Sequence, residues 1–200
     1  SSTLNSDLSR LSEWFRANKL ALNIKKTNYM IFTHGTKMLQ RLDINIDGIS
    51  IKQVDNVKFL GLYFDSKLQW EHHIKYLTKK LSSGLFVLNS LRHILPTRTL
   101  TTLYYSLIHS HLTYGCVLWG TTYRKYTHRI VVLQKKAIRI INGANYNATT
   151  SPLFKNNSIL KFEDIYKMLV CKQMHRIYRQ NVPVPLQGLL LQNVDVHNLQ

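Results

Sequence analysis

The side chains best suited to chemistry on phosphates are two adjacent lysines and a threonine, Lys25-Lys26-Thr27. Asn18 and Asn23 break the helical pattern that precedes them, and an apolar segment follows, so we expect a helix–strand loop here. A lysine ammonium has mobile donors that suit negative charge developing on phosphoryl oxygens. Taken alone, a lysine pair is more typical of a solvated loop, so the pattern leaves both interpretations open.

Positive charge is concentrated in the second part of the chain. The 200 residues carry a formal net charge of +17, and most of the surplus lies between residues 67 and 180. Such charge favours a polyanionic partner, because neutralised phosphates release their counterions. Eleven Tyr and three Trp among the cations favour nucleic acid over the alternatives, which are a solvated basic surface and an acidic membrane.

The helix-like segments predict where this charge is displayed. Apolar residues recur at helical spacing from Trp70 to Leu91, from Leu100 to Ile108, from Tyr126 to Ile141 and from Ile165 to Tyr178. We expect Thr97 to cap the second of these helices and Asn142-Gly143 to end the third. The cations that lie off the apolar stripes are predicted to contact nucleic acid, and they are Lys75, Lys79, Lys80, Lys135, Lys136 and Arg139.

The first third of the chain predicts one helix and about four strands. Leu4, Leu8, Leu11 and Phe15 are spaced as the buried stripe of the helix. Strands are expected over residues 27–33, 42–46, 49–51 and 57–64, with a hairpin turn at Asp47-Gly48 and a glycine turn at Gly61. The segment Val182–Pro185 is expected to be extended.

Neither the acidic residues nor the histidines predict a metal site. The acidic residues of the first third fall at predicted turns and strand ends, and the sequence contains no Asp-Asp pair. His72-His73 and His109-x-His111 lack the i, i+4 spacing of metal ligands on a helix, so exposed polar residues are expected there. Cys116 and Cys171 are expected to be free thiols in a reducing compartment. No membrane-length apolar run or signal peptide is visible, which predicts an intracellular protein of the nucleus, the cytoplasm or both.

The order of the motifs resembles the reverse transcriptases of non-LTR retrotransposons, the LINE-type elements. It begins with a helix, Asn-x-x-Lys-Thr ending at Thr27, a strand and then Phe59-Leu60-Gly61. It continues with L-Y-x-S-L-I from Leu103, L-x-Y-G from Leu112, Trp119-Gly120 and Q-K-K-A-I-R-I-I from Gln134. Together these blocks cover roughly residues 4–180 and look most like jockey-type elements.

This resemblance implies an α+β fold, a partial reverse-transcriptase palm of about four antiparallel strands followed by a mostly helical region. Residues 1–66 would be the partial palm, 67–95 a thumb-like helix, 96–180 a helical post-thumb region and 181–200 a tail. Lys26 would contact the incoming nucleotide or the leaving pyrophosphate, with Lys25 and Thr27 beside it. Phe59, Leu60 and Gly61 would form a strand turn that holds the primer.

The implied function is part of an RNA-directed DNA polymerase that binds RNA/DNA template–primer and positions the primer. The family's catalytic Asp box would lie upstream of Ser1, so this chain alone would be inactive and hold no cofactor. The whole enzyme, with its remaining N-terminal part, would use Mg²⁺. The alternatives are a catalytically inactive remnant that binds nucleic acid non-specifically, and a fragment with no selected role.

Overall fold

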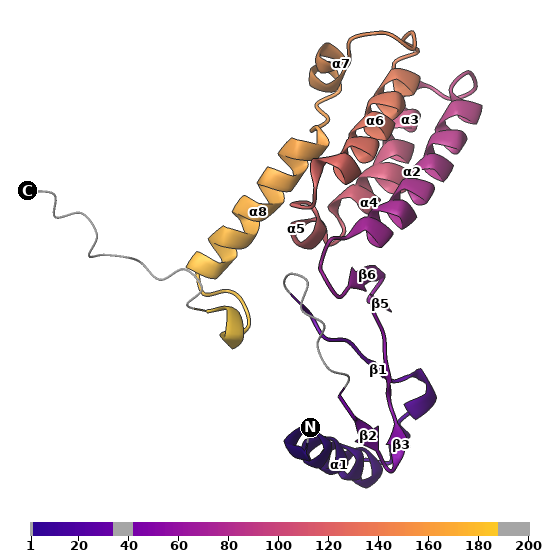
Figure 1. The fold of residues 1–200 in the computed structure, drawn as a ribbon. Helices are drawn as coiled ribbons and strands as arrows, with labels where there is room; N and C mark the ends of the chain where they lie inside the picture. The colour runs from indigo at the N-terminus through magenta and orange to yellow at the C-terminus, as the bar shows by residue number, and fades with distance from the viewer. Residues whose placement is uncertain (1, 34–41, 188–200) are drawn as a thin grey trace, which may run out of the picture. The chain divides into compact units, whose positions relative to one another are not determined.

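The computed structural model describes residues 2–33 and 42–187, and it divides between His73 and Ile74 into two compact units (Figure 1). The division lies near the charge boundary at residue 66, while the roles that the resemblance gives to the segments stay predictions. Within the described residues, every helix is too short or too polar to span a lipid bilayer.

In its described residues, 2–33 and 42–73, the first unit contains one long helix and six short strands. Helix α1 (Ser2–Ala17) is followed by the 3₁₀ turn η1 (Ile24–Lys26). The strands form three two-stranded sheets: β1 (Asn28–Tyr29) pairs in parallel with β4 (Lys52–Gln53), while β2 (Asn45–Ile46) with β3 (Ile49–Ser50) and β5 (Asn56–Phe59) with β6 (Leu62–Asp65) are antiparallel. The broad α+β prediction is confirmed, but the expected four antiparallel strands are wrong in number and, for β1–β4, in direction.

Two hairpin turns set the register of the antiparallel sheets. Asp47-Gly48 joins β2 to β3 with φ of 51° and 75°, and Leu60-Gly61 joins β5 to β6 with φ of 46° and 82°. Positive φ at both central residues defines the turn whose twist matches that of paired strands. The predicted Asp47-Gly48 hairpin is confirmed. The glycine turn expected at Gly61 is confirmed, but the single strand expected over residues 57–64 is wrong, because the two halves on either side of this turn pair with each other.

Helix α1 packs with a face that is rotated from the predicted leucine stripe and shares only part of it. Leu4 and Leu11 are exposed, while Leu8 packs against the core of Ile44, Ile46 and Ile51. The polar side chains of this face make the connections. Asn5 bonds Asp43 O and the Asn45 N–H at 3.0 and 3.1 Å, and Ser12 and Arg16 both contact the Asp47 carboxylate.

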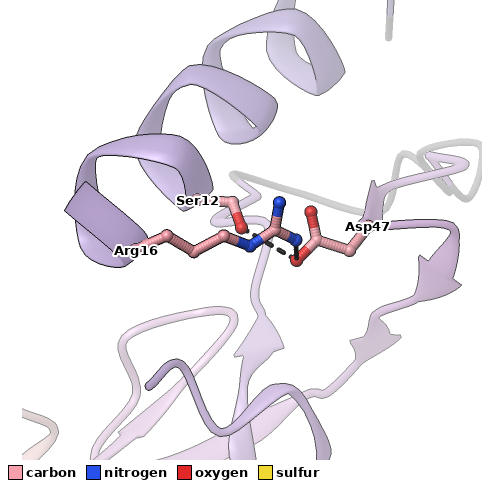
Figure 2. A network of polar contacts seen from close by, with 3 residues as sticks. All are labelled: Ser12, Arg16 and Asp47. Carbon is pink, nitrogen blue, oxygen red and sulfur yellow. Dashed lines mark hydrogen bonds and ion pairs between the residues drawn. The ribbon is translucent and has the colours of Figure 1, made fainter. Parts of the chain in front are cut away.

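Figure 2 shows how Asp47 joins the turn to the helix. Its Oδ2 accepts a hydrogen bond from Ser12 Oγ at 2.8 Å and lies 2.7 Å from Arg16 Nη2. Ser12 is almost fully buried, whereas the side chain of Arg16 is exposed. The partly buried hydroxyl bond therefore fixes this contact more firmly than the solvent-screened ion pair does.

The second unit is a bundle of helices around an apolar core. Its helices are α2 (Glu71–Leu91), whose first turn precedes the division, α3 (Thr97–Tyr104), α4 (Ser110–Thr113), α5 (Cys116–Trp119), α6 (Arg124–Ile141), α7 (Thr150–Asn156) and α8 (Phe162–Tyr178). A π-helical segment (Tyr105–His109) joins α3 to α4, and a 3₁₀ turn (Val184–Leu186) follows α8. The largest fully buried side chains include Trp119, Tyr104, Leu81, Leu88, Leu100, Ile108 and Ile130.

Two predicted details of this unit are wrong. Thr97 is the first helical residue of α3, Pro96 occupies the cap position, and no side chain caps the helix. The fixed φ of Pro96 suits the start of a helix, and its carbonyl accepts hydrogen bonds from the Thr99 and Leu100 N–H groups at 3.0 and 3.1 Å. The segment Val182–Pro185, expected to be extended, enters the 3₁₀ turn that spans Val184–Leu186.

A buried glutamine holds α6 in the bundle. Gln134 is 1% exposed, and its Nε2 donates to Tyr104 Oη at 2.8 Å and to Leu160 O at 2.9 Å. Its Oε1 accepts from the Phe162 N–H at 2.8 Å. Because these partners belong to α3, to the turn before α8 and to α8 itself, one side chain fixes the rotation of α6 against its neighbours.

Candidate nucleic-acid interface

Lys25 and Lys26 are displayed on a tight turn that holds them in solvent. Asn23 starts η1, and its Oδ1 accepts from the Lys26 N–H at 3.2 Å. The Thr27 hydroxyl donates back to Asn23 O at 3.0 Å, and the Thr27 N–H donates to Ile24 O. These bonds occupy the backbone and the threonine, while both lysine side chains are exposed. The predicted helix–strand loop is confirmed, whereas contact with a nucleotide stays a prediction.

The β5–β6 hairpin carries Phe59, Leu60 and Gly61 at its tip. Leu60 is 72% exposed and Phe59 is also exposed, so the tip presents apolar surface to solvent. At the base of the hairpin, Phe64 packs on Trp70 with ring centroids 5.1 Å apart. The tip is therefore a projecting apolar turn on an anchored base. Its role in holding a primer stays a prediction.

Asp65 organises the loop between this hairpin and α2. Its carboxylate accepts hydrogen bonds from the backbone N–H groups of Lys67, Gln69 and Trp70 at 3.2, 2.9 and 2.7 Å. Leu68 and Trp70 have positive φ, a backbone conformation that residues other than glycine rarely adopt. The three bonds stabilise this loop. The expectation that the aspartates serve local structure is confirmed for Asp47 and Asp65.

His73 corrects the expectation that the histidine clusters are exposed. It is 4% exposed, and its Nδ1 accepts a hydrogen bond from the Tyr63 N–H at 3.4 Å. Burial lowers the pKa of His73 from 6.5 to about 4, so this side chain is neutral at physiological pH. The missed signal is its position three residues after buried Trp70 and four before Leu77, on the apolar stripe of α2.

The apolar stripe predicted for α2 is confirmed, and it places the three lysines on the solvent side. Trp70, Ile74, Leu77, Leu81 and Leu88 are buried. Lys75, Lys79 and Lys80 are exposed, and Lys80 Nζ lies 5.7 Å from the centroid of the Tyr76 ring.

Helix α6 has the most one-sided charge of the described helices. Its buried face includes Ile130, Gln134, Ala137, Ile138 and Ile141. The solvent side carries six Lys or Arg side chains, and the helix contains no acidic residue. These cations are Arg124, Lys125, Arg129, Lys135, Lys136 and Arg139, hereafter the α6 basic face. Because like charges repel along a helix, this arrangement is favourable only beside solvent ions or a polyanion.

Lys136 and Arg139 also line a cavity that the sequence did not predict. Its other lining residues are Arg92 and His93, which follow α2, Ile140 of α6 and the loop Gly143–Tyr146. The cavity has a volume of about 490 Å³. It thus brings Arg92 beside α6 cations that lie more than forty residues away in the sequence. Lys80 precedes Arg92 by twelve residues, roughly 18 Å along the helix axis at 1.5 Å per residue, so the α2 lysines form a separate group.

The end of α6 shapes one wall of this cavity. The Ala144 N–H donates to Arg139 O and the Gly143 N–H to Ile140 O, and Gly143 has φ of 58°. This bond pattern is the Schellman motif that the Asn142-Gly143 pair predicts, and the prediction is confirmed. Arg139 Nε then donates to Ala148 O at 2.9 Å, which ties the guanidinium to the loop.

The described residues offer no cluster of three or more His, Cys, Asp or Glu side chains that could hold a metal ion. Cys116 and Cys171 are both free, as expected. Cys116 is buried, and its burial raises the pKa of the thiol to about 12, so the thiol is protonated at neutral pH.

Sequence comparisons identify proteins that resemble most of this chain. The chain is 26% identical over 162 residues to the "Probable RNA-directed DNA polymerase from transposon X-element" of Drosophila melanogaster, which covers 79% of this chain. It is 25% identical over 177 residues to the "Probable RNA-directed DNA polymerase from transposon BS" of that species, covering 87%, and 24% identical over 179 residues to its "RNA-directed DNA polymerase from mobile element jockey", covering 88%. The chain is distantly homologous to jockey-like non-LTR retrotransposon reverse transcriptases.

The match to these reverse transcriptases is partial in length. The chain spans about a fifth of the curated relatives that it matches, between 18% and 20% of their residues. No protein-family model and no solved structure matches it. The family resemblance drawn from the motifs is therefore supported at the level of distant homology, while the part of the enzyme that this chain represents stays a prediction.

Proposed function

We propose that this chain is a segment of the RNA-directed DNA polymerase of a non-LTR retrotransposon, and that it holds the template–primer by its sugar–phosphate backbone. Distant homology to jockey-like reverse transcriptases supports the family, and the basic helices support the task. In this proposal the first unit is the partial palm and the helices from α2 onward are the thumb and post-thumb regions. The active-site Asp box and its Mg²⁺ belong to another part of the polymerase.

The observation that carries the proposal is the α6 basic face. Its six cations lie on the solvent side of an 18-residue helix that contains no acidic residue. A surface that only needs solubility is served by mixed charges, whose pairs at i, i+4 also stabilise the helix. A rigid array of one sign instead matches the regular phosphates of a nucleic acid, where each neutralised phosphate releases a counterion.

The expected binding is strong at low salt and insensitive to base sequence. Backbone contacts fix position and orientation but carry no base information. If all six cations of the face neutralise phosphates, the slope of log K against log[salt] approaches about −5, at roughly −0.9 for each phosphate. Lys75, Lys79 and Lys80 add to this attraction from α2.

The first unit contributes two positioning elements in this proposal. Lys26, held outward on η1, contacts the phosphates of the incoming nucleotide or the leaving pyrophosphate, with Lys25 and Thr27 alongside. The apolar tip at Phe59-Leu60-Gly61 lies against the primer end, where Gly61 allows a close backbone approach. Support for both comes from the motif order and from their exposure.

Binding to a labelled RNA/DNA hybrid at graded salt tests the proposal. The paired substitution Arg129→Gln with Lys135→Gln removes two charges from the α6 basic face without touching the cavity. We expect weaker binding and a slope that is shallower by about two. The matched control replaces two exposed α8 lysines, Lys167→Gln with Lys172→Gln, and is expected to change the slope much less.

The outcomes separate the interpretations. Equal losses in both pairs would show that net charge alone attracts the hybrid, and would remove the α6 basic face as the binding surface. Salt-insensitive, sequence-selective binding would contradict backbone recognition altogether. A catalytically inactive binding module, the alternative function, would bind as proposed but would not support nucleotide addition in the polymerase that carries this segment.

A further inference from the structure

The cavity at the end of α6 has the composition of an anion site. Three basic side chains line it, Arg92, Lys136 and Arg139, and none of its lining residues is acidic. Converging cations repel one another unless an anion neutralises them. The chain thus holds like charges together around a hollow space, which favours an anionic occupant.

The two arginines are held in place by single bonds. Arg92 Nε donates to His93 Nε2 at 2.9 Å, and Arg139 Nε donates to Ala148 O at 2.9 Å. Each bond uses one nitrogen of the guanidinium and leaves the two terminal Nη groups for another acceptor. Guanidinium groups fixed in this way suit phosphate oxygens, which they can bind in a bidentate manner.

An aromatic side chain borders the same cavity. Tyr146 belongs to the loop that follows the Schellman turn and is 86% exposed. A tyrosine so open to solvent stabilises the fold very little. It does offer a free ring face, and a base can stack on such a face whatever its identity.

The size of the cavity indicates how much of a nucleic acid it can take. A volume of about 490 Å³ lies within the usual range of small-molecule sites, roughly 300–1,000 Å³, and suits one nucleotide. A duplex is too wide to enter and would contact the outer side of α6. From these features we infer that the cavity binds one unpaired nucleotide of a bound strand, with its phosphate on Arg92, Lys136 and Arg139 and its base on Tyr146.

This inference rests on the proposed nucleic-acid binding and makes it more specific, because it separates a single-stranded site from a backbone surface. The test compares a blunt RNA/DNA hybrid with the same hybrid carrying a short single-stranded overhang. Tyr146→Ala is expected to weaken binding of the overhang substrate by at least about 5-fold, the lower end of one base–aromatic stack. Binding of the blunt hybrid is expected to stay unchanged, and Tyr146→Trp is expected to retain the overhang preference.

Matched variants control for surface and charge. Tyr178→Ala removes a similarly exposed tyrosine from α8 and is expected to leave both substrates unaffected. Arg92→Gln is expected to make the salt slope shallower by about one for the overhang substrate alone. As competitors, a free mononucleotide is expected to displace the overhang at lower concentration than inorganic phosphate does, because only the nucleotide has a base to stack.

The remaining outcomes would overturn either the proposed function or the single-nucleotide site. If the unmodified chain binds neither hybrid, the proposed function fails and the inference fails with it. If it binds both hybrids but Tyr146→Ala changes neither, or changes both equally, the single-nucleotide site is wrong while backbone binding survives. If inorganic phosphate competes as well as the mononucleotide, the cavity is an anion site without base recognition, and the inference is overturned.

Discussion

Replacing Gln134 by leucine is expected to loosen α6 from the bundle. The substitution keeps nearly the same volume but removes every polar atom of a side chain that is 1% exposed. The Phe162 N–H, the Leu160 carbonyl and the Tyr104 hydroxyl would then lose their bonds to it, which measure 2.8, 2.9 and 2.8 Å. Removing the amide therefore leaves buried polar groups without partners. The buried area, which hardly changes, would not predict the resulting loss of stability.

The size of the stability loss depends on whether water can hydrogen-bond the groups that Gln134 leaves behind. The bond to Phe162 is buried, so that N–H would carry a full desolvation cost of about 1–3 kcal/mol. The bond to Leu160 is only partly buried, so water can satisfy part of its loss. The expected loss in the free energy of unfolding is therefore about 3 kcal/mol. Tyr104→Phe, which removes one acceptor and leaves Gln134 its other two bonds, is expected to cost about 1 kcal/mol.

Urea titration followed by far-UV circular dichroism measures both losses. In the Gln134→Leu background, Tyr104→Phe is expected to cost nothing further or to recover stability, because the hydroxyl there already lacks its donor. If Gln134→Leu lies within about 0.5 kcal/mol of the unmodified chain, a marginal change for one substitution, the amide does not fix α6. Fully additive losses in the double variant would show that the two side chains act independently.

Four further outcomes are expected. Burial lowers the pKa of His73 to about 4, so the folded state loses stability as the pH falls from 6.5 toward 4, by about 3 kcal/mol in all. Above pH 6.5 this loss is absent. Urea midpoints measured against pH should show it, and His73→Asn, which keeps an acceptor for the Tyr63 N–H, should make the midpoint depend less on pH. Asp65→Asn weakens three bonds to backbone N–H groups, so thermal unfolding should reveal a loss of about 1–2 kcal/mol, and an unchanged midpoint would contradict the role of the carboxylate. Ser158 ends α7 with φ of 51°, so Ser158→Gly should raise the unfolding free energy by about 0.5–1 kcal/mol, whereas a decrease would mean that the backbone there is not strained. In the polymerase that carries this segment, Lys26→Ala should slow nucleotide addition more than it weakens template binding, and equal turnover would remove the assignment.

The long helices could be predicted from the sequence because their apolar stripes are continuous. The stripe from Trp70 to Leu91 marks α2, and that from Tyr126 to Ile141 marks α6, to within about two residues at each end. Burial of a repeated stripe dominates the energy of such helices. The short α7 escaped prediction, since seven residues with two buried side chains form no recognisable period.

Elements that depend on polar partners could not be predicted. The leucines of α1 allow more than one buried face, and the choice falls to the bonds of Asn5 and Ser12 with the β2–β3 hairpin. The strand expected over residues 27–33 shrinks to Asn28–Tyr29, because within the described residues only β4 pairs with it. Pairing partners are distant in sequence, so periodicity alone does not reveal them.

The candidate site likewise has a part that the sequence predicts and a part that it does not. The solvent position of Lys75, Lys79 and Lys80, and of Lys135 and Lys136, follows from their place off the apolar stripes. The cavity does not, since Arg92 and Tyr146 come together only when the bundle folds. A lone arginine after a helix and a lone tyrosine in a loop carry no signal by themselves.

The one-signed outer surface of α6 has an energetic consequence for the bundle that carries it. Lys125 and Arg129, and Lys135 and Arg139, stand one turn apart, so each pair pushes on its own helix. Dissolved ions damp that repulsion and equally damp the pull on a strand, which means that added electrolyte should make the free bundle sturdier while it loosens the complex. A bound polyanion neutralises these charges more completely than dissolved ions do. The repulsion within α6 is therefore fully relieved only when the polyanion is bound.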